Sequence, residues 1–126
     1  MTTSDERRAA GREIQGRLWP ATRSGTGGTF PAAQLAPDFF DWVLQTTFGD
    51  VWSRPGLAVR DRSMITVAML AALRQTEELR AHLAGARSVG IDREELVEVL
   101  MQVGVYAGVP AAVAALRVAA DVLGTD

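Results

Sequence analysis

Apolar residues recur at helical spacing along most of the chain, and no stretch keeps the period of two that marks a β-strand. Residues 4–18 predict a charged, weakly amphipathic helix. A second helix is expected to begin at Pro37 and to end at Gly49. Residues 60–74 are apolar nearly all round after their first turn, which is typical of a buried helix.

Three further helices are expected in the second half. Thr76 is suited to cap one that Gly90 ends. Asp92 starts the next, and Glu95 completes a capping-box pair with it. The last helix is expected over residues 109–123. The pattern predicts an all-α fold of five to six helices in a single domain.

Two features qualify this picture. Residues 19–36 hold three glycines and two prolines, so we expect an irregular segment there. The helices at 62–73 and 109–123 are apolar on more than one face, which favours a homo-oligomer. An alanine-rich core, in which close helix packing uses every face, is the alternative.

Composition narrows the chemistry. The 126 residues contain no cysteine and no lysine, which excludes disulfides, thiolate metal sites, thiol redox cycles and a Schiff-base lysine. The net charge of −2 without a basic patch argues against nucleic-acid binding. We expect no metal and no membrane span, because ligand sets and long apolar runs are missing. The polar N-terminus, with no apolar signal core, predicts a cytoplasmic protein.

The one histidine, His82, is the first candidate for chemistry. At ~100° per residue, Gln75, Glu78 and His82 fall on the apolar side of their helix. Glu78 and His82 are four residues apart, so we expect the carboxylate to orient the imidazole and to raise its pKa. The pair is a candidate general acid/base. A purely structural pair at a helix or subunit contact is the alternative.

Aromatic residues and arginines supply the candidate substrate contacts. Seven of the eight aromatics precede residue 53, namely Trp19, Phe30, Phe39, Phe40, Trp42, Phe48 and Trp52. Trp52 beside Arg54 suits a planar, anionic ligand, with Arg62, Gln75 and Tyr106 as further candidate contacts. We expect Trp19 or Phe30, Trp52 and Tyr106 to line one cavity with His82. A solvated rim, with Asp50 and Asp61 pairing the arginines, is the alternative.

The segments "GDVWSRPGL", "ELRAHL" and "VYAGVPAA" resemble the carboxymuconolactone decarboxylase family. The resemblance implies a family core at 48–124 behind a divergent N-terminal cover at 1–47. It also implies an AhpD-like fold, similar to alkylhydroperoxidase D proteins, assembled as trimers or hexamers.

The peroxidase branch of that fold carries a glutamate, two cysteines and a histidine. By resemblance, the cysteines fall on Gln75 and Glu78, the histidine on His82 and the glutamate near Ser63. Without a thiolate the peroxidase reaction is excluded.

The resemblance therefore implies a cofactor-independent decarboxylase of a carboxylated lactone or a related small anionic substrate. Its catalytic residues would be His82 and Glu78. An isomerase, cyclase or lactone-processing enzyme on the same scaffold is one alternative, and a non-catalytic binding protein is another.

Overall fold

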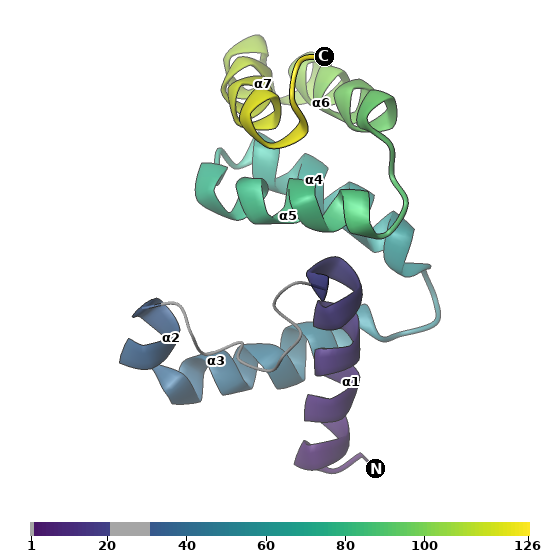
Figure 1. The fold of residues 1–126 in the computed structure, drawn as a ribbon, viewed down its shortest axis with the longest axis vertical. Coiled ribbons are helices and arrows are strands. Elements are labelled where there is room, and N and C mark those ends of the chain that lie inside the picture. The colour runs from purple at the N-terminus through teal and green to yellow at the C-terminus, as the bar shows by residue number, and fades with distance from the viewer. Residues whose placement is uncertain (1, 21–30) are drawn as a thin grey trace. The chain divides into compact units, whose positions relative to one another are not determined.

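The computed structural model describes residues 2–20 and 31–126, whose regular secondary structure is helical throughout, as predicted (Figure 1). The described helices are α1 (Ser4–Leu18), α2 (Pro31–Leu35), α3 (Pro37–Val43), the π-helix η2 (Leu44–Trp52), α4 (Val59–Ala72), α5 (Thr76–Ser88), α6 (Arg93–Ala107) and α7 (Val109–Leu123). They form two compact units, Met1–Val59 and Arg60–Asp126. A single domain over the whole chain stays a prediction.

The described residues hold more than five to six helices, for two reasons. Part of the segment expected to be irregular forms α2. The helix expected at 37–48 does not end at Gly49 but continues to Trp52 as η2. We expected Gly49 to be a helix terminator, whereas it serves as a packing residue.

In the first unit, α1 packs directly on η2 through two glycines. A Cβ atom at Gly11 would lie 2.5 Å from the Leu44 carbonyl oxygen, and one at Gly49 would collide with the backbone of Arg7. No side chain larger than hydrogen fits between the helices at these points.

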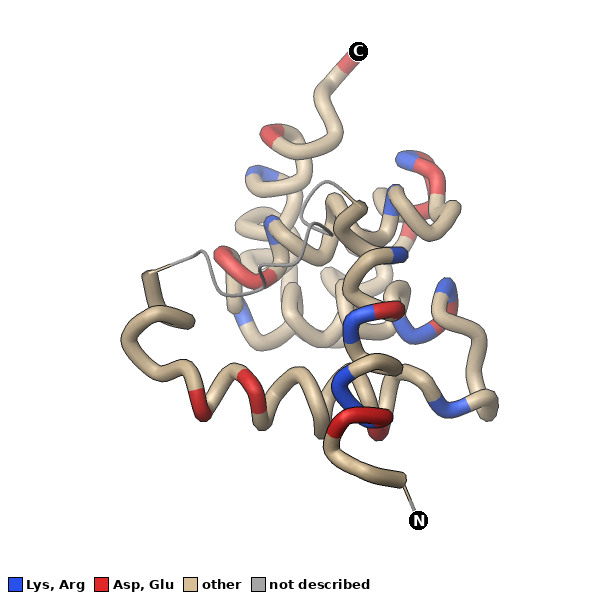
Figure 2. Tube along the Cα trace, turned by 60° about the horizontal axis from the view of Figure 1, so that its bottom comes forward, with Lys and Arg blue, Asp and Glu red and all other residues tan. Residues whose placement is uncertain are grey.

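Ion pairs fasten α1 to α3 and η2. Figure 2 colours the basic and acidic positions along the chain. Arg7 donates to both carboxylate oxygens of Asp50, at 2.9 and 2.7 Å, and Arg8 does the same to Asp41 at 2.7 and 2.9 Å. Gln45 joins the two pairs by accepting from Arg7 and donating to Asp41. Hydrogen bonds from the two arginines hold the pKa of each aspartate below its usual value.

These shifts predict a loss of stability in acid. A carboxyl whose pKa is lower in the folded chain stabilises the fold above its unfolded pKa, and this contribution disappears as the pH falls through the folded value. We expect the melting temperature to fall more between about pH 5 and pH 2 in the wild type than in Asp50→Asn. Asp38→Asn is the control because Asp38 is exposed and forms no ion pair with a described residue. An equal fall in all three proteins would contradict the prediction.

The second unit packs α4 to α7 around one aliphatic core. Its fully buried members include Val67 on α4, Leu79 and Leu83 on α5, and Leu96 and Leu100 on α6. Helix ends follow the sequence signals closely. Gly90, with φ of +95°, ends the segment after α5, as predicted.

The capping box at the start of α6 is confirmed. The Glu95 N–H donates to Asp92 Oδ1 at 2.8 Å, and the Asp92 N–H donates to Glu95 Oε1 at 3.1 Å. The other carboxylate oxygen of Glu95 accepts from Arg60 on α4. By contrast, Thr76 is the first residue of α5 rather than its cap, and the N-cap residue Gln75 makes no side-chain capping bond.

The same unit exposes large apolar side chains on its outer helices. Ile65 and Met69 on α4 are about half exposed, while Val105 and Tyr106 on α6 are 77% and 84% exposed. Surface of this kind is typical of protein interfaces. Among the described residues no helix is long and apolar enough to span a membrane.

Candidate active site

Three polar side chains are buried within the described residues: Gln45, Ser63 and His82. Gln45 is accounted for by its bonds to Arg7 and Asp41 in the first unit. Ser63 on α4 is fully buried, and its hydroxyl makes no hydrogen bond with the described part of the chain. Buried polar groups cost free energy unless they are paired, so the Ser63 hydroxyl marks the second unit, which also buries His82, as the place to look for chemistry.

His82 lies on the packing face of α5, with Leu79, Leu83 and Ala86 buried around it in sequence. Only 8% of the surface of His82 is exposed to solvent. Burial lowers the pKa of the imidazole to about 4. Our expectation of a raised pKa is therefore wrong: desolvation disfavours the charged ring, and the imidazole is neutral at physiological pH.

Glu78 and Gln75 do not share that buried environment, because both side chains are exposed. The helical wheel placed them on the apolar side, but α5 begins only at Thr76. Gln75 lies outside the helix and Glu78 lies in its first turn, where a carboxylate is favoured by the helix N-terminus. The roles predicted for Gln75 and Glu78 therefore do not depend on their being buried beside His82.

The lowered pKa of His82 can be measured directly, because no other histidine contributes to the spectrum. We expect NMR titration to give a value near 4 in the folded protein and near 6.5 in urea. Since the unfolded chain takes up its proton first, stability is lost as the pH falls from about 6.5 towards 4. A folded value at or above 6.5 would contradict the prediction and favour a charged partner.

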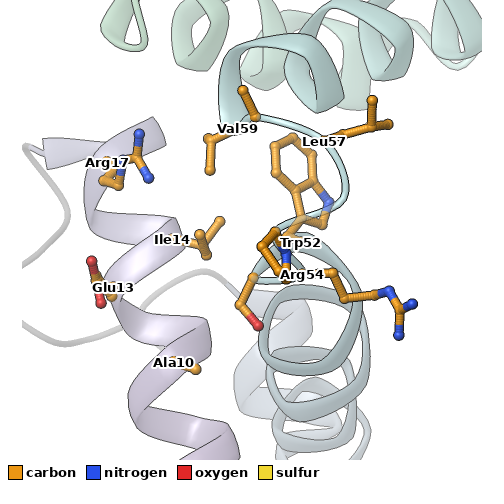
Figure 3. Close-up of a pocket in the computed structure, with 11 residues that line it drawn as sticks. Ala10, Glu13, Ile14, Arg17, Trp52, Arg54, Leu57 and Val59 are labelled. Atoms are coloured by element: carbon orange, nitrogen blue, oxygen red, sulfur yellow. The ribbon is translucent and has the colours of Figure 1, made fainter.

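In the first unit, a cavity of about 360 Å³ brings Trp52 and Arg54 together with residues of α1 (Figure 3). Trp52 is buried and stacks on Phe48, whose ring meets Trp19 edge-on. Sequence reasoning missed Arg17 here. Its spacing from Ala10, Glu13 and Ile14 marks one face of α1, so a helical wheel for residues 4–18 would have found it.

In the second unit, a groove of about 540 Å³ lies between α4 and α6. Tyr106 lines it beside apolar residues such as Met64, Met69 and Val99, but His82 is not among the described residues that line it. A common cavity for Trp52, Tyr106 and His82 stays a prediction. Phe30, the other aromatic expected there, lies outside the described residues.

The remaining candidates have separate surroundings. In the alternative of a solvated rim, Asp50 and Asp61 pair with the arginines near Trp52; in the structure Asp50 pairs with Arg7, and Arg60 pairs with Glu95. Arg62 is half-buried at the start of α4. Across the described residues no cluster of three or more histidine, aspartate or glutamate side chains could hold a metal ion.

Comparison with known proteins identifies the family of this chain. The Carboxymuconolactone decarboxylase family matches residues 37–121, about two thirds of the chain. This chain belongs to that family. It is 41% identical over 85 residues to a 4-carboxymuconolactone decarboxylase from Acinetobacter baylyi, covering 68% of this chain and 63% of that protein. It is 31% identical over 98 residues to a nitrosuccinic acid decarboxylase from Metarhizium robertsii, covering 78% of this chain and 64% of that one.

The region that matches the carboxymuconolactone decarboxylase family has different bounds from the family core that we expected. It begins at residue 37, earlier than the core boundary of 48 that we expected, and so includes α3 and all of η2. It leaves α1 outside. In both comparisons the alignment spans slightly less than two thirds of the relative.

Proposed function

We propose that this chain is a cofactor-independent decarboxylase of a carboxylated lactone or a related small organic acid. The observation that carries the proposal is that both relatives reported above are named as decarboxylases, with the more similar one 41% identical. The substrates in their names differ, so we propose a reaction type and a substrate class rather than one substrate.

The chemistry needs no cofactor when the substrate supplies its own electron sink. In a carboxylated butenolide, the bond between the ring carbon and the carboxylate breaks and carbon dioxide leaves. The electron pair enters the C=C–C=O system, and negative charge collects on the lactone carbonyl oxygen. A proton then adds to carbon and restores the carbonyl. The protein has to stabilise the oxyanion and deliver the proton.

We propose His82 for the first of these tasks. A neutral imidazole keeps one N–H, and in a dry site that N–H is an effective hydrogen-bond donor to a developing oxyanion. The low pKa disfavours a resting imidazolium, so His82 would deliver a proton only as part of a relay that returns it. The other proposed residues are Glu78, as the group that orients the imidazole, and Gln75, Arg62, Tyr106, Trp52 and Arg54, as substrate contacts.

Product analysis tests the reaction type. We would incubate the protein with carboxymuconolactone labelled with ¹³C in the carboxylate and follow the label by NMR and mass spectrometry. Release of labelled carbon dioxide with a product lacking that carboxyl supports the proposal. An isomer of unchanged mass would identify an isomerase or cyclase instead. Binding without turnover would identify a binding protein.

We also propose that the chain forms a homo-oligomer, a trimer or a hexamer. The support is the exposed apolar surface of α4 and α6, which includes Met69 and Val105. We expect sedimentation to show an assembly for the wild type, and a shift toward monomer for Val105→Asp because a charge would be buried at the interface. Arg117→Glu, at an exposed polar position on α7, is the control. A wild-type monomer at micromolar concentration would contradict the proposal.

A further inference from the structure

The cavity of the first unit has an apolar floor. Ile14 on α1, Trp52 at the end of η2 and Val59 are 5–8% exposed and line it (Figure 3). Its volume of about 360 Å³ lies in the range of small-molecule sites. An indole beside aliphatic side chains favours a ligand with a flat, unsaturated body.

Two arginines stand at the rim. Arg17 lies in the last turn of α1 and Arg54 in the turn after η2. Figure 3 shows them on opposite sides, with Ile14 and Trp52 between them and the Arg54 guanidinium extending outward. Both arginines are exposed, so their long side chains can reorient.

The arginines of α1 are not equivalent. Arg7 and Arg8 are each bound to two oxygens of an aspartate. Arg17 has no hydrogen bond or ion pair with a described residue, although Glu13, one turn earlier, lines the same cavity. A guanidinium at the rim of an apolar cavity is suited to bind a carboxylate.

The two walls of this cavity differ in their relation to the family. Trp52 and Arg54 lie inside the matched region 37–121, whereas Arg17 and Ile14 lie outside it. The matched wall supplies one cation and the indole. The wall outside the match adds the second cation, so α1 can set which ligands this chain accepts.

We infer that Arg17 is a specificity-determining residue, and that the cavity selects planar organic dianions over monoanions of the same shape. One carboxylate contacts Arg17, the other contacts Arg54, and the unsaturated body packs on Trp52. The inference deepens the proposed function by naming the charge class of its substrate, and it rests on that function for the link between binding and turnover.

A matched pair of probes tests this inference without turnover. trans,trans-Muconate and sorbate share one six-carbon diene, and sorbate carries a methyl group where muconate carries its second carboxylate. We expect calorimetry at low salt to show muconate binding about fivefold more tightly than sorbate, the size of effect that one partly exposed ion pair gives. Arg17→Gln should weaken muconate binding by about the same factor and change sorbate binding by less than about twofold.

Two further variants separate a direct contact by Arg17 from a general effect of charge on α1. Arg12→Gln removes the same charge from an exposed position of α1 that does not line the cavity, and it should leave both affinities within about twofold of wild type. Glu13→Gln removes a negative charge from the rim, so muconate should bind more tightly. This gain keeps the test decisive even if Arg17→Gln does not fold.

The inference is overturned if muconate does not bind, if it binds no better than sorbate, or if Arg17→Gln and Arg12→Gln weaken it equally. It is also overturned if Glu13→Gln leaves muconate binding unchanged. Muconate selectivity in a protein that releases no carbon dioxide would leave this inference standing and refute the proposed reaction. Decarboxylation without muconate selectivity would do the reverse.

Discussion

Replacing His82 with asparagine should lower the rate of decarboxylation by about 10²–10⁴-fold while the protein stays folded. Asparagine keeps a polar donor in the buried position but cannot place it where the imidazole N–H lies. The readouts are kcat on the labelled substrate and the melting temperature. A catalytic role predicts a large fall in kcat with a small change in stability.

The result would contradict the catalytic assignment if His82→Asn kept full turnover, or if activity fell only in proportion to the folded fraction. Glu78→Gln is the companion variant, since Glu78 is exposed and its loss should cost little stability. If Glu78 orients the imidazole, this variant lowers kcat; if it is only a first-turn carboxylate of α5, kcat is unchanged. Because the His82 pKa is about 4, the rate should not fall between about pH 8 and pH 6 through titration of His82.

Gly49→Ala should destabilise the protein by about 1–3 kcal/mol, because a methyl group at this position collides with the backbone of Arg7. Backbone cannot rotate away as a side chain can, so α1 and η2 must move apart. Gly11→Ala should act in the same way, since its Cβ would lie 2.5 Å from the Leu44 carbonyl oxygen. Urea unfolding followed by circular dichroism measures the loss.

Gly56→Ala is the matched control, because a Cβ atom there would have no neighbour within 4 Å. We expect it to remain within about 1 kcal/mol of wild type, on the stabilising side, through loss of unfolded-chain entropy. Equal destabilisation at Gly49 and Gly56 would contradict close packing as the reason for glycine at position 49, because a methyl group at Gly56 meets no neighbour.

Helix positions were predictable in the second unit because its signals are local. The Asp92–Glu95 capping box and Gly90 each act within a few residues of the chain, and each marks a helix terminus that the structure shows. Local signals failed at Gly49. Its role depends on Arg7, which is 42 positions away in sequence, and periodicity carries no information about such a contact.

Sequence patterns predicted one part of the candidate site and missed another. The wheel placed His82 on the buried side of α5, and the structure buries it. It placed Glu78 and Gln75 there as well, but both are exposed: Gln75 precedes α5, which begins at Thr76, and Glu78 lies in its first turn. The direction of the His82 pKa shift was missed for a related reason. Desolvation depends on everything packed around the ring, and sequence spacing shows only the nearest carboxylate.

The Glu95 carboxylate has a mechanical consequence for the second unit. One oxygen accepts from the Asp92 N–H at the start of α6, and the other accepts from Arg60 at the start of α4. Arg60 and Glu95 are 35 residues apart in sequence, and one side chain thereby ties the two helix beginnings together. Fraying at either beginning releases a bond that holds the other, so we expect the first turns of α4 and α6 to open as one cooperative unit instead of two independent ends. In Glu95→Gln, amide hydrogen exchange should accelerate at both turns together, even though only one residue has changed.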